Sequence, residues 1–140
     1  VEDCGNYAST TWEIARSARR FECGSPNMTG IHALHASLSL VEDTGIHTIE
    51  ARILENSRFL IDFFLDNQDR FELITPVPAH RHAGIVTFRP RKETPQAIFE
   101  RLTESRVSCA LRGGGIRFSP HYYTPREQLA GVLELLEAPA

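Results

Sequence analysis

Three consecutive glycines, Gly113 to Gly115, constrain the fold more than any other part of this chain. They separate two extended runs, Val107–Leu111 and Ile116–Ser119. Because glycine adopts backbone conformations that a β-carbon forbids, the glycines predict a tight turn that folds one run back beside the other. The sequence therefore predicts a β-hairpin in the last third of the chain.

An arginine stands on either side of this turn, Arg112 before it and Arg117 after it. A guanidinium offers a fixed fork of donors that matches carboxylate and phosphate groups. Together with the open backbone of the glycines, the two arginines suggest a place that meets an anion. The alternative is a hairpin whose arginines are simply solvated, and these residues alone leave both interpretations open.

The composition is that of one globular domain. The chain has 140 residues, of which 41% are hydrophobic and 24% are charged, so it is long enough to bury a core. Its net charge of −3 argues against a nucleic acid partner, because proteins that bind the phosphate backbone are usually basic. No apolar run reaches membrane-spanning length and no leader segment precedes the body, so no membrane association is expected.

The cysteines and histidines carry no pattern of a metal or disulfide site. Cys4, Cys23 and Cys109 are an odd number without CxxC spacing, which argues against a disulfide framework or a zinc knuckle and favours a cytoplasmic location. His32 and His35 are three residues apart but have no acidic or cysteine partner in register. The His80-Arg81-His82 segment is interpreted as a solvated or substrate-facing loop, so no metal site is predicted.

Residues 1–22 are polar and lack clear periodicity, so they are interpreted as an extended lead-in from a larger protein, with a short helix expected at 12–19. Turn-forming residues follow at 21–30. The folded domain is expected to occupy residues 23–140.

Two segments have the apolar spacing of long helices. Residues 31–41 place apolar side chains on one face, and Thr29 is the expected N-cap. Asp43-Thr44-Gly45 predicts the end of that helix, and residues 46–64 form a second apolar stripe.

Beyond Asn67 the pattern changes to short strands, expected at 71–75 and 84–89 and on both sides of the glycines. A helix is expected from Thr94-Pro95, and Thr124-Pro125-Arg126-Glu127 has the spacing of a capping box that starts a terminal helix. The predicted fold class is α+β, with two long helices leading into a small, at least partly antiparallel sheet that has helices packed on one face.

Two segments carry a resemblance to a known family. The first reads Arg20-Phe-Glu-Cys-Gly-Ser-Pro-Asn27 and precedes a glycine and a long helix. The second reads Ile116-Arg-Phe-Ser-Pro-His-Tyr-Tyr-Thr124 and precedes the terminal helix. In this order and spacing they resemble the carboxy-terminal part of class V aminotransferases, pyridoxal-phosphate enzymes of fold type I related to cysteine desulfurases, kynureninase and isopenicillin-N epimerase. The resemblance extends over about Arg20 to Glu137.

The resemblance implies roles for three residues. Gly24 and Ser25 match the position that reaches across the family's homodimer to the pyridoxal phosphate of the neighbouring subunit, and a hydroxyl and an open backbone amide both donate to phosphate. Arg117 matches the arginine that holds the α-carboxylate of the amino-acid substrate. Arg112 lies near it in the sequence and is given no role.

The chain also departs from the family pattern. The family attaches its cofactor to a lysine in a Ser/His-Lys segment upstream of everything seen here, and the one lysine of this chain, Lys92, lies in a polar, proline-flanked stretch that does not match it. The aspartate that pairs with the cofactor's pyridine nitrogen and the residue that stacks on its ring are also missing. The resemblance therefore implies a carboxy-terminal fragment that lacks an amino-terminal large domain and does not turn over substrate by itself.

Cysteine desulfurases carry a nucleophilic cysteine on a loop just before the carboxylate arginine. Here Gly-Gly-Gly-Ile fills the space between Arg112 and Arg117, and Cys109 alternates with Val107 and Leu111 as a small core residue would. This favours aminotransferase, epimerase or kynureninase-like lyase chemistry over desulfuration. Two alternatives from other classes are a free-standing module that binds an anion at the glycine turn and an interaction domain whose two long helices dock a partner.

Overall fold

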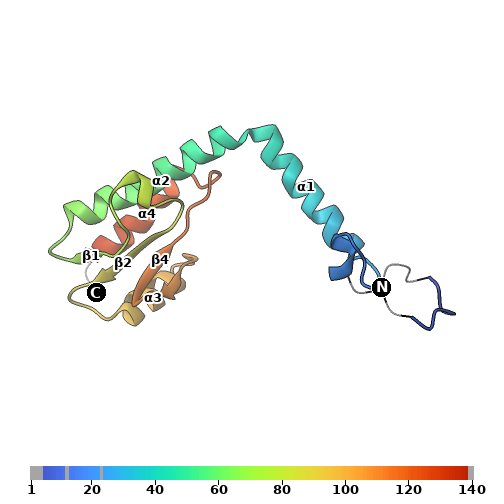
Figure 1. Ribbon diagram of the computed structural model, residues 1–140. Coiled ribbons are helices and arrows are strands. Elements are labelled where there is room, and N and C mark those ends of the chain that lie inside the picture. The colour runs from blue at the N-terminus through green and yellow to red at the C-terminus, as the bar shows by residue number, and fades with distance from the viewer. Residues whose placement is uncertain (1–4, 12, 23, 139–140) are drawn as a thin grey trace. The chain divides into compact units, whose positions relative to one another are not determined.

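The computed structural model describes residues 5–11, 13–22 and 24–138, so Cys4, Trp12 and Cys23 lie outside the described residues. The chain forms two compact units, Val1–Leu40 and Val41–Ala140. Figure 1 shows the whole chain with its helices and strands labelled. The division expected after residue 22 stays a prediction.

The first unit contains less regular structure than expected. In place of a helix at 12–19, its described part has a single 3-10 turn, η1, at Ala18–Phe21, which begins after Ser17. Helix α1 covers Met28–Thr44. Its start is capped by Asn27, whose Oδ1 accepts a hydrogen bond from the backbone N–H of Gly30 at 2.9 Å. The prediction of Thr29 as N-cap is wrong, because the short asparagine side chain already reaches the free N–H three residues on.

Gly45 separates α1 from the next helix, α2, which covers Ile46–Asp66. The φ angle of Gly45 is 83°, a conformation that favours glycine at the end of a helix. The break predicted at Asp43-Thr44-Gly45 is confirmed.

The second unit contains a four-stranded sheet with the order β1-β2-β4-β3, in which all neighbouring strands are antiparallel. The strands are β1 at Phe71–Leu73, β2 at Val86–Pro90, β3 at Ala110–Arg112 and β4 at Gly115–Phe118. The predicted α+β class is confirmed, and the strands at 71–75 and 107–111 are shorter than their sequence runs.

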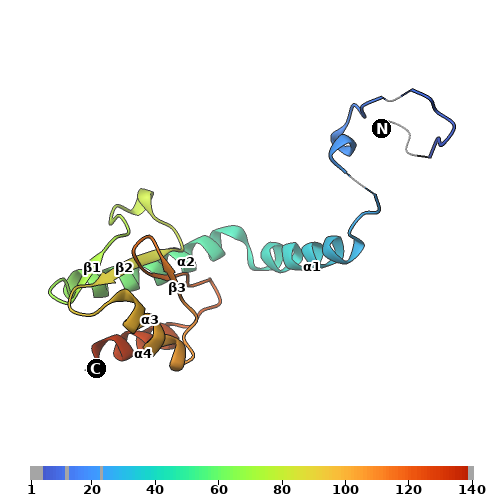
Figure 2. The same cartoon turned by 90° about the horizontal axis from the view of Figure 1, so that it is seen from below.

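Three helices, α2, α3 at Pro95–Glu104 and α4 at Arg126–Glu137, supply the apolar residues that pack against the sheet (Figures 1 and 2). Alternate residues of β2 and β4, such as Val86 with Phe88 and Ile116 with Phe118, contribute to the same core. Because alternate strand residues share one face, the helices cover one face of the sheet. The buried core cluster consists of Leu60, Ile61, Phe64, Phe71, Val86, Phe88, Ile98, Leu102, Ile116, Phe118, Leu129, Leu133 and Leu136.

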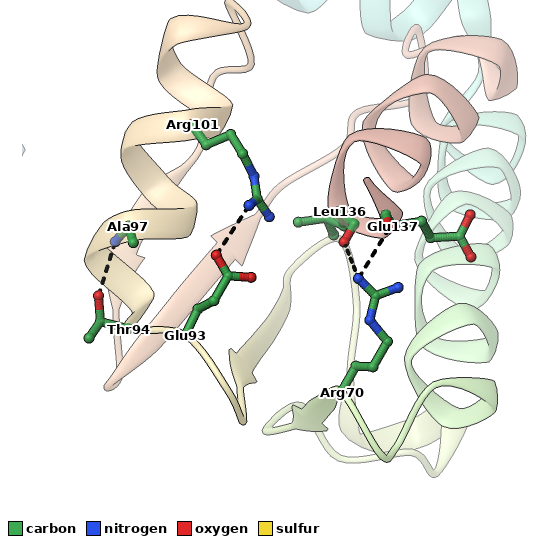
Figure 3. Close-up of polar contacts among 7 residues, drawn as sticks. All are labelled: Arg70, Glu93, Thr94, Ala97, Arg101, Leu136 and Glu137. Carbon is green, nitrogen blue, oxygen red and sulfur yellow. Dashed lines mark hydrogen bonds and ion pairs between the residues drawn. The ribbon is translucent and has the colours of Figure 1, made fainter. Parts of the chain in front are cut away.

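Polar contacts fix the ends of α3 and α4 (Figure 3). Thr94 Oγ1 accepts a hydrogen bond from the N–H of Ala97 at 3.2 Å, which confirms the predicted start of α3. Beyond this start, Arg101 of α3 pairs with Glu93 at 3.1 Å. Arg70 Nη2 donates to the carbonyl oxygens of Leu136 at 2.8 Å and Glu137 at 3.3 Å, the last carbonyls of α4.

The capping box predicted at the start of α4 is absent. The N-cap is Pro125, and the hydroxyl of Thr124 instead accepts a hydrogen bond from the N–H of His121 at 2.9 Å. The hydroxyl thus closes the turn before the helix rather than the helix itself.

No helix among the described residues is both long enough and apolar enough to cross a membrane. The same part of the chain holds no group of three or more His, Cys, Asp or Glu side chains placed to bind a metal ion.

Candidate functional site

The turn between β3 and β4 requires glycine at its three positions for two different physical reasons. Gly113 and Gly114 have φ angles of 61° and 74°, which other residues rarely adopt. A β-carbon at Gly115 would collide with the carbonyl oxygen of Phe88 on the neighbouring strand. Arg89 Nε donates to the carbonyl oxygen of Gly114 at 2.8 Å and ties the turn to β2. The glycines form a tight strand connection, as the sequence predicted.

Arg117 lies in β4 and is held from both sides. It pairs with Thr87 of β2 and with Ala110 of β3, so its backbone position is fixed by two ladders. The side chain is half-buried, and no residue that the structure describes accepts a hydrogen bond from its buried Nε. An anionic ligand would supply the missing acceptor, since a buried guanidinium nitrogen without a partner is costly.

A cavity of about 730 Å³ includes Arg117 in its lining. It lies where the chain leaves the sheet, because the ladder between β3 and β4 ends at the pair Ala110 and Arg117 and residues 106–109 lie outside it. Arg106, with a φ of 61°, turns the chain out of α3 at this point. Helix α4 supplies much of the remaining wall. The volume is within the range of roughly 300–1,000 Å³ that is common for sites of small molecules.

Two buried polar residues of α2 hold the loops that flank the strands β2 and β4. Asn56 Nδ2 donates to the carbonyl oxygens of His121 at 3.1 Å and Thr124 at 3.2 Å. Ser57 Oγ donates to the carbonyl oxygen of Ala83 at 2.7 Å. Asn56 thereby fixes the loop that follows Arg117, and Ser57 fixes the loop that precedes β2.

Sequence reasoning missed Asn56 and Ser57, although a signal existed. Both occupy positions that the apolar stripe of α2 would give to hydrophobic residues, three or four residues from Leu60 and within one turn of Ile53. A polar residue at a core position of a helix implies a hydrogen-bond partner elsewhere in the fold.

Cys109 is half-buried, directly precedes β3 and lines the cavity. Burial raises the pKa of its thiol. A nucleophilic cysteine needs a lowered pKa, so the Cys109 thiol has the character of a small core residue. The sequence pattern had favoured the same interpretation.

Gly24 and Ser25 lie in the first unit, whereas Arg117 and the cavity lie in the second. Both residues are exposed, and Gly24 has a φ of 68° with nothing within 4 Å of the place where a β-carbon would stand. This open backbone beside a serine hydroxyl fits the donor set that a phosphate needs. Arg112 is exposed at the end of β3, and Lys92 is exposed between β2 and α3.

Comparisons with known proteins place this geometry in context. The family model of class-V aminotransferases matches residues 4–130. A probable cysteine desulfurase of Pyrococcus abyssi is 28% identical over 90% of this chain, which corresponds to 34% of that protein. The chain thus spans about a third of the length of this relative.

Solved structures share the fold. The apo cysteine desulfurase of Thermococcus onnurineus superposes with a TM-score of 0.80 at 20% identity, covering 90% of this chain and 34% of that one. A mutant of the protein C-DES, solved with glycine covalently linked to its pyridoxal-phosphate cofactor, superposes with a TM-score of 0.74 at 24% identity, covering 86% and 32%.

Proposed function

Because the chain belongs to the class-V aminotransferase family, we propose that it is the carboxy-terminal domain of a cytoplasmic, pyridoxal-phosphate-dependent enzyme that acts on an amino acid. Residues 23–140 form this domain, and residues 1–22 lead into it from an amino-terminal large domain. Pyridoxal phosphate, when bound, supplies the electron sink that makes bonds at the α-carbon of an amino acid labile. Lys92 is exposed and does not match the family's Ser/His-Lys segment, so we assign the cofactor lysine to the large domain.

The surface of helix α1 is an argument for a larger partner domain. No charged residue occurs from Met28 to Leu40, and the side chains of Ile31, Leu34 and Leu38 are exposed. Exposed apolar side chains that recur along one helix are ordinarily covered by another part of a protein. The large domain covers it in the complete enzyme.

Arg117 binds the α-carboxylate of the substrate. The observation that carries this role is the buried Nε of Arg117, which lacks a hydrogen-bond acceptor among the described residues. The ladders to β2 and β3 fix the backbone of Arg117. The guanidinium is therefore anchored to a rigid strand and orients the substrate that it binds.

Gly24 and Ser25 donate hydrogen bonds to the cofactor phosphate of the neighbouring subunit in a homodimer. The open backbone at Gly24 and the exposed hydroxyl of Ser25 support this role.

Transamination, elimination and epimerisation all begin with an amino acid whose carboxylate is held in place, and Arg117 serves each of them. A second candidate, carbon–sulfur bond cleavage, is favoured by the similarity to the cysteine desulfurase of Pyrococcus abyssi. Burial raises the pKa of the Cys109 thiol, which argues against this cysteine as the nucleophile of such a reaction.

The test is steady-state kinetics of the complete enzyme with Arg117→Ala. We expect KM for an α-amino acid to rise by a factor that corresponds to about 2–5 kcal/mol, the usual cost of truncating one partner of a buried charge pair. Cofactor binding, followed by absorbance, should remain unchanged. Arg112→Ala is the matched control, and its KM should stay within about threefold of wild type. An Arg117→Ala enzyme with wild-type KM would remove Arg117 from the site.

A further inference from the structure

The side chain of Arg117 lies on the face of the sheet opposite α2, α3 and α4. Ile116 and Phe118, its neighbours in β4, both belong to the buried core that these helices complete. Because successive strand residues point to opposite faces, Arg117 points away from that core. Thr87 likewise stands between two core residues of β2, so its side chain lies on the same face as that of Arg117.

Thr87 and Arg117 are direct neighbours across the two strands. The backbone N–H of Thr87 donates to Thr75 Oγ1 at 2.8 Å, and its carbonyl oxygen accepts from the N–H groups of Ile74 at 2.9 Å and Thr75 at 3.2 Å. Both backbone groups of Thr87 therefore face the β1 side, and its pair with Arg117 is of the non-hydrogen-bonded kind. In such pairs the side chains come closest, with β-carbons about 4.5–5.5 Å apart.

The hydroxyl of Thr87 is available to a ligand. Thr87 is half-buried, and its hydroxyl makes no hydrogen bond to a residue that the structure describes. Arg117 Nε also lacks an acceptor in this part of the chain. Two neighbouring donors without protein partners match a carboxylate, which offers two acceptor oxygens.

The surroundings of Arg117 on this face favour an anion. A β-carbon at Gly115, two residues before Arg117, would lie 3.0 Å from Ile74 Cδ1, so the side chain of Ile74 extends over this face as far as β4. An apolar group beside a charge displaces water and strengthens its attraction to a counter-charge. Glu72, the acidic residue of the described strands, pairs with Arg89 at 3.3 Å. The charge of Arg117 is therefore left for a ligand.

We propose that the Thr87 hydroxyl is a second donor to the substrate carboxylate, beside the guanidinium of Arg117. This inference rests on the proposed function, because it takes the carboxylate of an amino acid as the ligand of Arg117. It adds a residue of β2 to the site. Donors from two paired strands fix the orientation of the carboxylate more closely than one arginine does.

The experiment measures inhibition of the complete enzyme by propanoate, a carboxylate without an amino group. Thr87→Val removes the hydroxyl and keeps the shape of the side chain. The inhibition constant should rise by about tenfold or more, the factor for one hydrogen bond to a charged group. Thr87→Ser keeps the donor and should stay within about threefold of wild type. A rise of less than about threefold in Thr87→Val, or an equal rise in Thr87→Ser, would overturn the proposal.

Two controls separate the contact from the fold. Valine suits a strand as well as threonine, so the melting temperature of Thr87→Val should not fall by more than a few degrees. If this variant does not fold, Thr87→Ala removes the same donor and is measured in its place. Thr103→Val, which removes an exposed hydroxyl that donates to the carbonyl oxygen of Phe99 within α3, should leave the inhibition constant unchanged.

Arg117→Ala distinguishes failure of this inference from failure of the proposed function. If Arg117→Ala raises the inhibition constant and Thr87→Val does not, the arginine binds the carboxylate and the role of Thr87 is wrong. If Thr87→Val raises it and Arg117→Ala does not, the proposed role of Arg117 is wrong, and Thr87 shares no ligand with it. If neither variant changes it, both roles are wrong.

Discussion

Asn56 makes two hydrogen bonds from one buried amide, and both acceptors are backbone carbonyls of the loop that follows β4. Asn56 is 7% exposed, so water cannot readily replace its side-chain amide as the donor. Ser57, which is fully buried, makes the matching contact to the loop before β2. Two neighbouring side chains of one helix thus fix the loops at the same end of β2 and β4, the end at which Val86 pairs with Phe118.

Asn56→Ala removes the side-chain donor to the carbonyl oxygens of His121 and Thr124, of which that of His121 still accepts from the N–H of Thr124. The substitution should lower the free energy of unfolding by about 1–3 kcal/mol. Urea denaturation followed by circular dichroism measures this change. Ser39→Ala, which removes a half-buried hydroxyl that donates to the carbonyl oxygen of His35 within α1, is the control and should change stability by less than about 0.5 kcal/mol. Equal effects of the two substitutions would contradict the role of Asn56.

Cys109 leads to a prediction about pH. Because burial raises the pKa of its thiol, the folded chain holds less thiolate than the unfolded chain at any pH between the ordinary and the raised pKa. In a chain with Cys4→Ser and Cys23→Ser, iodoacetamide should therefore alkylate Cys109 several times more slowly in buffer at pH 8.5 than in urea. The linked contribution to stability is present below the unfolded-state pKa and is lost as the pH rises through the folded-state pKa. Alkylation that is as fast in buffer as in urea would mark Cys109 as a reactive thiol.

At the scale of elements, the end of α4 depends on a residue far away in the sequence. Arg70, in the connection between α2 and β1, donates to the last carbonyls of the helix, which have no partner within it (Figure 3). The positive charge also lies at the negative end of the helix dipole.

Arg70→Ala should destabilise the chain by about 1–2 kcal/mol and speed hydrogen exchange in the last turn of α4. Arg58→Ala, on the exposed side of α2, is the matched control and should have little effect on either measurement. If exchange in α4 is unchanged in Arg70→Ala, the contact does not hold the helix end.

Local sequence signals predicted the elements whose causes are local. The break at Gly45 and the start of α3 at Thr94 were correct, because positive φ and a threonine cap each act within a few residues. The capping box at Thr124 failed because the hydroxyl has a competing donor, the N–H of His121. The run at 107–111 was predicted as a strand, but its pairing with β4 begins only at Ala110.

In the candidate site, too, the sequence indicated the features with local causes and not those that depend on tertiary packing. Arg117 could be singled out from its motif, since the residues around it are contiguous in the sequence. The cavity could not, because its wall combines residues 106–110, the end of β4 and one face of α4, which come together only through tertiary packing.

On the scale of the whole molecule, the buried core is concentrated in one of the two units. Every residue of the core cluster lies between Leu60 and Leu136, inside the unit Val41–Ala140. This unit therefore contains the contacts that drive its own folding.

The fragment Val41–Ala140 should unfold in a single cooperative transition, with a melting temperature within a few degrees of that of the complete chain. Differential scanning calorimetry of both chains measures this, and Leu60→Ala in the fragment is the control that should lower the transition strongly. A fragment without a cooperative transition would show that residues 1–40 are needed for the core.

The turn at Gly113 and Gly114 has a consequence for how this family of domains can change over evolution. Its two residues set which residues of β3 and β4 face each other, from Arg112 with Gly115 to Ala110 with Arg117. Since successive strand residues point to opposite faces, a register slip of one residue would turn the side chain of Arg117 to the other face of the sheet. Substitutions elsewhere in the hairpin can be repaired one at a time, but an insertion or deletion in this turn must preserve the register or arrive together with a compensating bulge.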